Sequence, residues 1–445
     1  MSDSLDTITA IATPPGKGGV GVIRVSGPLA SIIAQKICGT LPEVRRAHFC
    51  QFRQSCGLVV DEGLALFFRG PHSFTGEDVL ELQGHGGSVV LNTVLQCCLD
   101  AGARLARPGE FSERAFLNGK MDLVQAEAVA DLIDAQTTQA AKSAMRSLQG
   151  DFSNAVHHLV ELLIRLRMFV ESAIDFPDED IEFIENSTVK SDLQHICQQL
   201  EATFKSANQG VLLKEGVTVV IAGKPNAGKS SLLNVLAGQE RAIVTDIAGT
   251  TRDVLREQIH IDGLPLHIID TAGIRETSDA VEKEGVKRAR VALAEADLII
   301  WLTDITSSET DSLNLPEELS STPVLRVFNK SDLAFGLDTS TVQDDDSLIS
   351  AKTGEGIEAF KAKLKNAAGF VDGESTFIAR TRHLEALMSA KNSIENGLSA
   401  VNEHEACELL AEELFHAQQA LSRITGEFTS DDLLGEIFST FCIGK

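Results

Sequence analysis

The eight residues from Gly223 to Ser230 have the types and spacing of a loop that binds nucleotide phosphates. They read Gly-Lys-Pro-Asn-Ala-Gly-Lys-Ser, which fits G-x-x-x-x-G-K-[ST]. We expect a strand over residues 217–222 before the loop and a helix from residue 231 after it. Backbone N–H groups of such a loop surround phosphate oxygens, Lys229 would reach the β- and γ-phosphates, and Ser230 would bind Mg²⁺. The nucleotide contacts expected here are Asn226, Ala227, Gly228, Lys229, Ser230 and Ser231.

Three further motifs follow in the order typical of a GTPase. A strand ends at Asp270, which would hold the Mg²⁺ shell, and Gly273 would sense the γ-phosphate. After another strand comes Asp332, whose carboxylate can accept hydrogen bonds from the N1 and N2 donors of guanine, a donor pair that adenine lacks. The third motif, residues 350–352, would close over the guanine base. The contacts expected from these motifs are Asp270, Thr271, Ala272, Gly273, Asn329, Lys330, Asp332, Ser350, Ala351 and Lys352.

A polar segment between the phosphate loop and Asp270 carries a second Mg²⁺ ligand. One threonine should complete the Mg²⁺ shell when the γ-phosphate is bound, and the residues alone leave Thr250 and Thr251 as alternatives. The segment as a whole is predicted to line the nucleotide. Its members are Thr245, Asp246, Ile247, Ala248, Gly249, Thr250 and Thr251.

One position departs from the Ras-like pattern. There, a Gln after the D-x-x-G motif orients the attacking water, whereas this chain has Ile274, which cannot form that hydrogen bond. Another group must orient the water and neutralise the charge of the transition state. Arg252, Arg275 and Glu282 are candidates, and a monovalent cation is another.

The length, composition and charge of the chain indicate how many domains carry these motifs and which partners they can bind. The chain has 445 residues, 43% of them apolar, which suggests about three domains with real cores. The formal charge of −25 excludes a histone-like binder of nucleic acid. Residues 1–118, however, carry 10 Lys and Arg against 11 Asp and Glu, so the N-terminal part can still face an anion.

The predicted secondary structure changes in type along the chain, which indicates a multidomain fold. Residues 1–118 alternate short strands with turns and predict an α+β domain. Residues 119–212 and 373–445 have helical periodicity and predict the two parts of one all-α domain. Residues 213–372 alternate strands and helices and predict an inserted α/β, Ras-like P-loop GTPase domain.

The sequence does not support a zinc-binding, redox, membrane-spanning or secreted protein. The eight cysteines include no C-x-x-C pair, so zinc and thioredoxin-type sites are not expected. No apolar run approaches the length of about 18 residues needed to span a membrane, and the first ten residues do not resemble a secretion signal. We expect a cytoplasmic protein without a membrane partner.

Beyond the nucleotide motifs, the chain resembles the MnmE (TrmE) family of tRNA-modification GTPases, in the TrmE-Era-EngA-like group. The resemblance covers essentially the whole chain. Outside the GTPase motifs it rests on Pro14-Pro15-Gly16, Ser73-Phe74-Thr75-Gly76-Glu77-Asp78, Arg107-Pro108-Gly109-Glu110-Phe111-Ser112 and Phe441-Cys442-Ile443-Gly444-Lys445.

The resemblance implies an N-terminal domain that binds tetrahydrofolate and forms a homodimer. With an FAD-dependent MnmG-type subunit, in a heterotetramer, such proteins add an aminomethyl or carboxymethylaminomethyl group at C5 of the wobble uridine, position 34, of certain tRNAs. The one-carbon unit comes from methylene-tetrahydrofolate, and 5-formyl-tetrahydrofolate is the related ligand. The folate positions carried over are Arg24, Glu81, Lys120 and Lys445. A carboxylate such as Glu81 suits the N–H edge of a pterin, and the three cations suit an anionic glutamate tail.

The same resemblance implies that K⁺ activates hydrolysis. It assigns the K⁺ ligands to Asn226, Thr245, Ile247 and Thr250, and the second Mg²⁺ ligand beside Ser230 to Thr251. Glu282 matches the catalytic acid that helps position water. The prediction is therefore an enzyme, a GTP hydrolase in tRNA modification.

The alternative is an Era-like GTPase switch in ribosome assembly. Such proteins usually carry a basic RNA-binding appendage, and none is visible in this sequence. A mechanical membrane GTPase would need an amphipathic basic helix or an apolar anchor, and neither is found.

Overall fold

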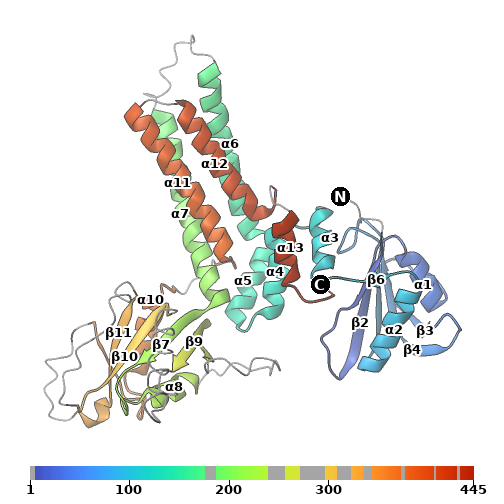
Figure 1. Ribbon diagram of the computed structural model, residues 1–445, viewed down its shortest axis with the longest axis horizontal. Coiled ribbons are helices and arrows are strands. Elements are labelled where there is room, and N and C mark those ends of the chain that lie inside the picture. The colour runs from blue at the N-terminus through green and yellow to red at the C-terminus, as the bar shows by residue number, and fades with distance from the viewer. Residues whose placement is uncertain are drawn as a thin grey trace, which may run out of the picture. The chain divides into compact units, whose positions relative to one another are not determined.

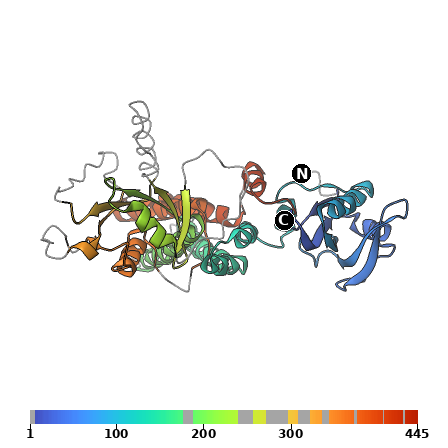
Figure 2. The same cartoon turned by 90° about the horizontal axis from the view of Figure 1, so that it is seen from below.

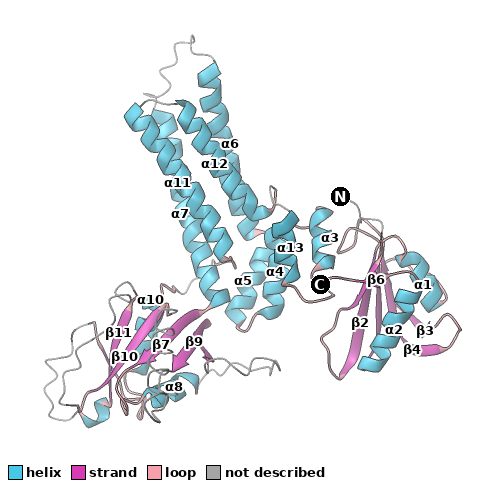
Figure 3. Ribbon diagram, viewed as in Figure 1, coloured by secondary structure: helices cyan, strands magenta, loops and turns pink. Residues whose placement is uncertain are grey.

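The computed structural model describes most of the chain. The described residues are 6–175, 187–238, 256–270, 296–307, 322–334, 343, 345–371, 376–404, 407–427 and 431–444. They form two compact units: Met1–Ala130 with Ser147–Ile196 and Ser389–Lys445, and Asp131–Arg146 with Cys197–Met388. Figure 3 shows the described strands gathered into two sheets, with helices making up the other regular elements.

The first unit begins with a largely antiparallel sheet, in the order β3-β4-β5-β2-β1-β6 (Figure 1). Only the short pairing of β1 with β6 is parallel. In β2, buried Ile23 and Val25 alternate with partly exposed Arg24, so one face of the sheet is apolar. The strands are β1 (Ile8–Ile11), β2 (Gly18–Ser26), β3 (His48–Arg53), β4 (Val59–Phe68), β5 (Val79–Gly86) and β6 (Arg104–Leu105).

Two helices, α1 (Ala30–Cys38) and α2 (Ser88–Asp100), cover that apolar face (Figures 1 and 2). Ile33 and Ile37 lie one turn apart on α1 and are buried with Leu91 of α2. Arg24 lies on the opposite face, where Phe111 of α3 (Glu110–Leu117) is buried with Ile8 and Ala10 of β1.

The remaining helices of the first unit pack through apolar stripes. α6 (Asp151–Asp175) and α12 (Cys407–Thr425) lie side by side. Both have buried apolar residues at spacings of three and four, the period of a helix with one buried face. On α6 these residues are Phe152, Val156, Leu159, Leu163, Leu166 and Val170, and on α12 they are Leu410, Leu414, Ala417, Leu421 and Ile424.

The C-terminal helix α13 (Asp431–Ser439) packs against α3 (Glu110–Leu117) and the start of α4 (Leu123–Asp134). Phe438 and Phe441 are buried there beside Phe116 and Leu123. Beyond α13, Ile443 forms a bridge with Pro108, and the Gly109 N–H donates to the Cys442 oxygen at 3.4 Å. The end of the chain is therefore fixed against the loop that precedes α3.

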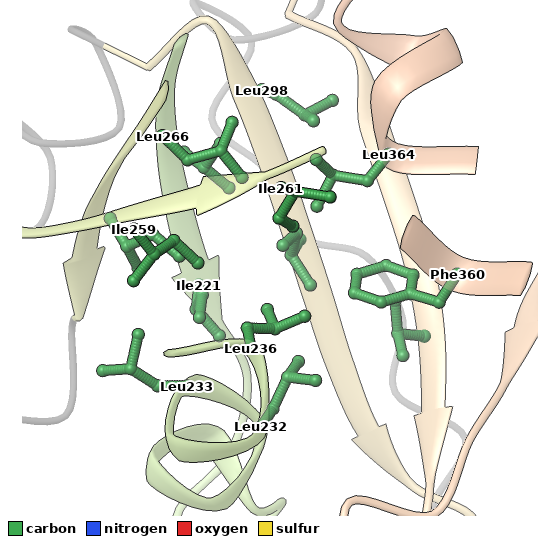
Figure 4. Close-up of a cluster of buried hydrophobic side chains, with 14 of the residues drawn as sticks. Ile221, Leu232, Leu233, Leu236, Ile259, Ile261, Leu266, Leu298, Phe360 and Leu364 are labelled. Atoms are coloured by element: carbon green, nitrogen blue, oxygen red, sulfur yellow. The ribbon is translucent and has the colours of Figure 1, made fainter. Parts of the chain in front are cut away.

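The second unit contains a sheet in the order β12-β11-β10-β7-β9-β8. Every described pairing is parallel except that of β8 with β9. Figure 4 shows its core, where Leu232 and Leu236 from the helix after β7 meet Ile221, Ile259 and other strand residues. The strands are β7 (Val217–Ala222), β8 (Arg256–Ile261), β9 (Leu264–Asp270), β10 (Leu298–Asp304), β11 (Val324–Asn329) and β12 (Ser347–Leu348).

Helices complete the second unit. Those of the described residues include α8 (Lys229–Ala237), α10 (Ile357–Ala367) and parts of α5 (Thr138–Leu148), α7 (Ser187–Glu215) and α11 (Thr381–His404). Asp131 ties the helical segments together, because its carboxylate pairs with Lys214 at 3.1 Å and with Arg380 at 3.0 Å. The Thr137 hydroxyl donates to the Gly263 oxygen at 3.3 Å, in the turn between β8 and β9.

The predicted fold class is confirmed: an α+β part, helical parts and a P-loop α/β sheet occur in one chain. The predicted strand 217–222 matches β7, and the helix expected from residue 231 begins two residues earlier, at Lys229. Among the described helices, none has the length and apolar character that crossing a membrane requires.

Candidate functional site

Four loops of the second unit meet at one edge of its sheet. β7, β10, β11 and β12 run parallel, so the segments that follow them all leave from the carboxyl edge. In open α/β sheets this edge is where ligands bind. The phosphate loop, Asp304, the Asn329–Asp332 segment and Ser350 therefore share the position expected of a nucleotide site.

The phosphate loop is shaped by backbone conformations that favour glycine. Gly223 and Gly228 have φ of 149° and 98°. A Cβ on Gly223 would lie 2.1 Å from the Leu302 oxygen, and one on Gly228 would lie 2.2 Å from Nδ2 of Asn329. Asn226 has φ of 64°, in the left-handed region, and its side chain is exposed. The two glycines are thus needed both for conformation and for close packing.

Lys229, the first residue of α8, is folded back onto its own loop. Its ammonium donates to the Gly223 oxygen at 2.6 Å and to the Lys224 oxygen at 3.1 Å, and the residue is buried. Ser230 and Ser231 follow in the first turn of α8 and are exposed. The cation and the helix N-terminus are therefore together where an anion would be stabilised.

Asn329 connects the phosphate loop to the base-side loops. Its Nδ2 donates to the Ala227 oxygen at 2.8 Å, and its Oδ1 accepts the Ala351 N–H at 3.0 Å. The residue is only 2% exposed, so both hydrogen bonds are protected from water. The Asn329 side chain therefore connects three of the predicted nucleotide-binding motifs.

Asp332 is oriented by a neighbour. Oγ of Ser350 donates to its Oδ1 at 2.7 Å, and Ser350 itself is buried. The Ser350 hydroxyl also accepts the Thr353 N–H at 3.1 Å, which fixes its direction. Oδ2 of Asp332 has no hydrogen bond among the described residues, so it can accept from a ligand.

Lys330 pairs with a carboxylate that sequence reasoning did not single out. Its ammonium lies 2.5 Å from Oδ2 of Asp304, at the end of β10, and Lys330 has φ of 68°. Burial opposes ionisation of Asp304, but hydrogen bonds from Lys330 and Thr306 outweigh it and lower the pKa of that carboxyl. The register of β10 and β11, which places Asp304 opposite Asn329, brings the pair together.

Part of the predicted nucleotide site lies outside the described residues. The backbone of Asp270 ends β9, beside Ile221 at the same edge as the phosphate loop. Lys352 is exposed next to buried Ala351. The predicted site residues that lie outside the described residues are Thr245, Asp246, Ile247, Ala248, Gly249, Thr250, Thr251, Thr271, Ala272, Gly273 and Glu282.

A second candidate site lies on the sheet of the first unit. Arg24 of β2 and Glu81 of β5 are opposite each other in register, and both Nε and Nη2 of Arg24 contact Oε1 of Glu81, at 3.0 and 2.9 Å. The guanidinium carbon also lies 5.4 Å from the Phe74 ring centre and 5.8 Å from that of Phe111. Oε2 of Glu81 has no partner in the described structure.

A buried ion-pair network supports this second site. Glu110, 2% exposed, accepts hydrogen bonds from Arg104, Arg114 and the Arg107 N–H, at 2.9, 3.1 and 2.8 Å. Burial opposes its ionisation, yet these donors lower the pKa of the Glu110 carboxyl to about 2.

Arg114 extends the network to the loop before β5. It donates to both carboxylate oxygens of Glu77 at 3.1 Å, and Glu77 in turn accepts from the Ser26 hydroxyl at 2.7 Å. Arg114 also pairs with Asp6 at 2.5 Å. Sequence reasoning did not assign a role to these residues, although the alternation of Arg and Glu over residues 104–114 is a signal of ion pairing.

The other predicted folate positions are placed differently. Lys120 is exposed, and its ammonium donates to the Pro71 oxygen at 2.9 Å rather than to Arg24 or Glu81. Lys445 lies outside the described residues. Its neighbour Gly444 packs closely against the Ile11 oxygen at the end of β1, so the chain end is held at the same sheet.

Comparisons with known proteins cover the whole chain. The family model described as GTP-binding protein TrmE N-terminus matches residues 7–120, and the model described as MnmE helical domain matches residues 123–442. The chain is 56% identical over 455 residues to a tRNA modification GTPase MnmE of Pseudomonas paraeruginosa, covering all of both chains. It is 55% identical over 447 residues to the protein of that name from Coxiella burnetii, covering 99% of each.

A likeness to solved structures is limited to part of the chain. A variant of Era from Aquifex aeolicus, crystallised with GDP and aluminium fluoride, is 26% identical, with 40% of this chain and 66% of that chain covered. The TM-score is 0.27, which is too low to support an inference.

Proposed function

Because the chain belongs to the MnmE family of tRNA modification GTPases, we propose that it hydrolyses GTP as part of tRNA modification. The observation that carries this proposal is the joining of the phosphate loop to the guanine-side loops through buried Asn329. The full-length similarity favours this reading over an Era-like switch in ribosome assembly.

Guanine recognition is proposed for Asp332. Its Oδ1 is held by Ser350, so its free Oδ2 has a fixed direction toward the N–H edge of a base. Phosphate binding is proposed for Lys229, which would exchange its two carbonyl partners for phosphate oxygens. The other nucleotide contacts keep the assignments predicted from the motifs.

Two metal ions complete the proposed nucleotide site. The Ser230 hydroxyl is exposed and has no hydrogen bond among the described residues, which suits an Mg²⁺ ligand, with Thr251 as the proposed second ligand. Asn226 is exposed beside the loop and offers a neutral carbonyl oxygen, which suits K⁺. Thr245, Ile247 and Thr250 are the proposed further K⁺ ligands. K⁺ would stabilise charge developing at the β/γ-bridge.

Glu282 is the proposed group that positions water, since Ile274 cannot. The test is steady-state GTP hydrolysis in KCl and in NaCl at matched ionic strength. We expect faster hydrolysis in KCl, and loss of that difference in Asn226→Ala with GTP binding retained. Equal rates for the wild-type chain in the two salts would contradict K⁺ activation.

The second site is proposed to hold a tetrahydrofolate derivative. Oε2 of Glu81 can accept from the N–H edge of a pterin, while Arg24 holds the carboxylate in place through Oε1. Lys120 and Lys445 are proposed to face the anionic tail. When bound, methylene-tetrahydrofolate would supply the one-carbon unit for C5 of the wobble uridine.

A homodimer is proposed through the β3–β4 part of the first sheet, on the face opposite α1 and α2. Phe49 and Leu64 are cross-strand partners there, and they are 65% and 39% exposed. Their neighbours Cys50 and Ala65 are buried on the opposite face, against the helices. Adjoining exposed apolar side chains mark an interaction surface where they form part of a contiguous patch. An FAD-dependent MnmG-type subunit and tRNA are the other proposed partners.

We also propose the domain division predicted from the sequence: 1–118, 119–212 with 373–445, and 213–372. The short link between residues 120 and 123 in the two family matches is compatible with the first boundary.

The function is tested by mass spectrometry of tRNA nucleosides from a bacterial strain that lacks its own MnmE-type protein. Expression of this chain should restore the modified wobble uridine, and expression of Gly228→Ala should not. Failure of the expressed wild-type chain to restore the nucleoside would contradict the proposed role.

A further inference from the structure

Three cationic side chains and a histidine gather at one end of the first sheet, around the turn after β4. We call Arg45, Arg69, His72 and Lys120 the cationic rim. Nη2 of Arg45 donates to the His72 oxygen at 2.6 Å, and the His72 N–H donates to the Arg69 oxygen at 3.0 Å. Lys120 donates to the oxygen of Pro71, between them, at 2.9 Å. These contacts place the four residues side by side.

The charges of the rim are not neutralised by neighbouring acids. All four residues are exposed. Arg45, Arg69 and Lys120 form no ion pair with a carboxylate of the described residues. The Arg45 guanidinium donates to the His72 oxygen and lies 5.9 Å from the Phe68 ring centre, and the Lys120 ammonium donates to the Pro71 oxygen. Two carboxylates touch the edge of this region: Glu43 pairs with Arg46 at 3.0 Å, and Asp78 accepts the Gly70 N–H at 2.9 Å. The rim is therefore a concentrated positive surface.

The location is notable in a chain with a formal charge of −25. Residues 1–118 have a net charge of −1, so a large anion would meet much less repulsion here than elsewhere on the chain. Cations that are free of carboxylate partners are the groups that exchange counterions for the phosphates of a nucleic acid.

The loop from Arg69 to Asp78 connects the rim to the proposed folate site. Phe74 of this loop lies against the Arg24 guanidinium, and Glu77 is held by Arg114. The aliphatic part of Lys120 packs on Gly76 of the same loop. A uridine that receives a one-carbon unit at the Arg24–Glu81 site must have its sugar–phosphate backbone close by, and the rim lies at the other end of this short loop.

We propose that the cationic rim binds the phosphate backbone of the tRNA loop whose uridine is modified. The proposal rests on the proposed function and assigns the RNA surface of that same site. Arg45 and Arg69 would contact phosphates, because their guanidinium groups are exposed and suit bidentate recognition of phosphate. Such contacts position the RNA without reading its sequence.

The experiment is titration of the full-length protein into a labelled, unmodified tRNA transcript at several salt concentrations. The variants are Arg45→Gln, Arg69→Gln and the double variant. We expect each substitution to weaken binding about tenfold, and the slope of log affinity against log salt to fall by about 0.7 to 0.9 per lost phosphate contact. GTP hydrolysis should be unchanged.

Arg53→Gln is the matched control. Arg53 is also an exposed arginine whose Nη1 donates to a backbone oxygen, that of Gly57, at 3.2 Å. It ends β3, whereas Arg45 precedes the start of that strand, so the two lie about 17 Å or more apart along the sheet. We expect the control to bind tRNA within about twofold of wild type.

Wild-type affinity and salt slope in the double variant would overturn the proposal, as would an equal loss in Arg53→Gln or the absence of salt-dependent binding by the wild-type chain. The nucleoside assay separates this failure from that of the proposed function. If the wild-type chain restores the modified uridine while the double variant binds tRNA normally, the rim proposal fails and the function stands.

Discussion

The nucleotide site and the Arg24–Glu81 site are built from different materials. In the first, backbone groups form the phosphate loop, and glycines at positions 223 and 228 allow the chain to pass close to Leu302 and Asn329. In the second, charged side chains from separate segments hold one another, with Arg24 on Glu81 and Arg114 on Glu77. The first site therefore depends on conformation, and the second depends on charge.

This difference predicts which changes damage which site. A backbone-built site is sensitive to an added Cβ and insensitive to loss of a distant charge. A site built from ion pairs is sensitive to neutralisation of one partner, because the remaining buried charge is left without compensation.

The largest effect on ligand binding is expected for Gly228→Ala. The new Cβ would lie 2.2 Å from Nδ2 of Asn329 at a φ of 98°, so the loop must shift. Strain of this kind costs about 1–3 kcal/mol, which would weaken GTP binding about 5- to 150-fold. Fluorescence titration with a labelled GTP analogue measures it. Gly369→Ala is the control, because it has a φ of 72° but no atom within 4 Å of the added Cβ. Equal losses in both variants would contradict the argument from close packing.

The next effect is a change of base preference in Asp332→Asn. An amide can donate to the additional carbonyl of xanthine but cannot accept both guanine N–H groups as a carboxylate does. Hydrogen bonds to a charged group contribute about 1.5–3 kcal/mol, so the ratio of GTP affinity to xanthosine triphosphate affinity should fall at least about tenfold. Competition binding measures the ratio, with exposed Asp345→Asn as the control. An unchanged ratio would remove Asp332 from guanine recognition.

A pH-dependent effect on stability, rather than on ligand binding, is expected for Glu110→Gln. The carboxyl of Glu110 has its pKa lowered from 4.5 to about 2 in the folded protein. Its charge therefore stabilises the fold above pH 4.5, and this contribution is lost as the pH falls toward 2. The pKa shift corresponds to a contribution of roughly 3 kcal/mol to the free energy of unfolding at pH 7. At pH 7 the variant should therefore unfold at a lower urea concentration than wild type. At pH 3 the difference in midpoint between the two proteins should be smaller.

Glu113→Gln is the matched control for that experiment. Glu113 pairs with Arg107 at 3.0 Å, and the Arg107 side chain is 62% exposed. A pair exposed in this way contributes about 0–1 kcal/mol. Far-UV circular dichroism of the full chain follows unfolding in both variants. A difference between Glu110→Gln and wild type that is the same at pH 7 and pH 3 would contradict the electrostatic account.

The same contrast explains what could be predicted from the sequence. The phosphate loop requires glycine and lysine at fixed spacings within eight residues, so its motif, strand and helix are visible in a local window. The fold class followed from local periodicity and is confirmed. The role of Asn329 as a bridge was less visible, because its partners Ala227 and Ala351 come from loops that only the sheet order brings together.

The partners in the ion-pair network around Arg114 could not be predicted from the sequence. Asp6, Glu77 and Arg114 lie far apart in the chain and meet only when the antiparallel sheet and α3 have formed. The contact between Arg24 and Glu81 depends on the register of β2 and β5, which periodicity alone does not fix. The resemblance pointed to both residues but did not indicate that they pair with each other.

Calorimetric titration of 5-formyl-tetrahydrofolate and of GDP into the same three full-length proteins tests most directly whether the two sites are built separately. The proteins are wild type, Glu81→Gln and Gly228→Ala. We predict that Glu81→Gln loses at least about tenfold in folate affinity with GDP binding unchanged, because only the charged carboxylate is paired with Arg24. Gly228→Ala should lose GDP affinity with folate binding unchanged. Wild-type folate affinity in Glu81→Gln, or no folate binding by the wild-type protein, would contradict the account.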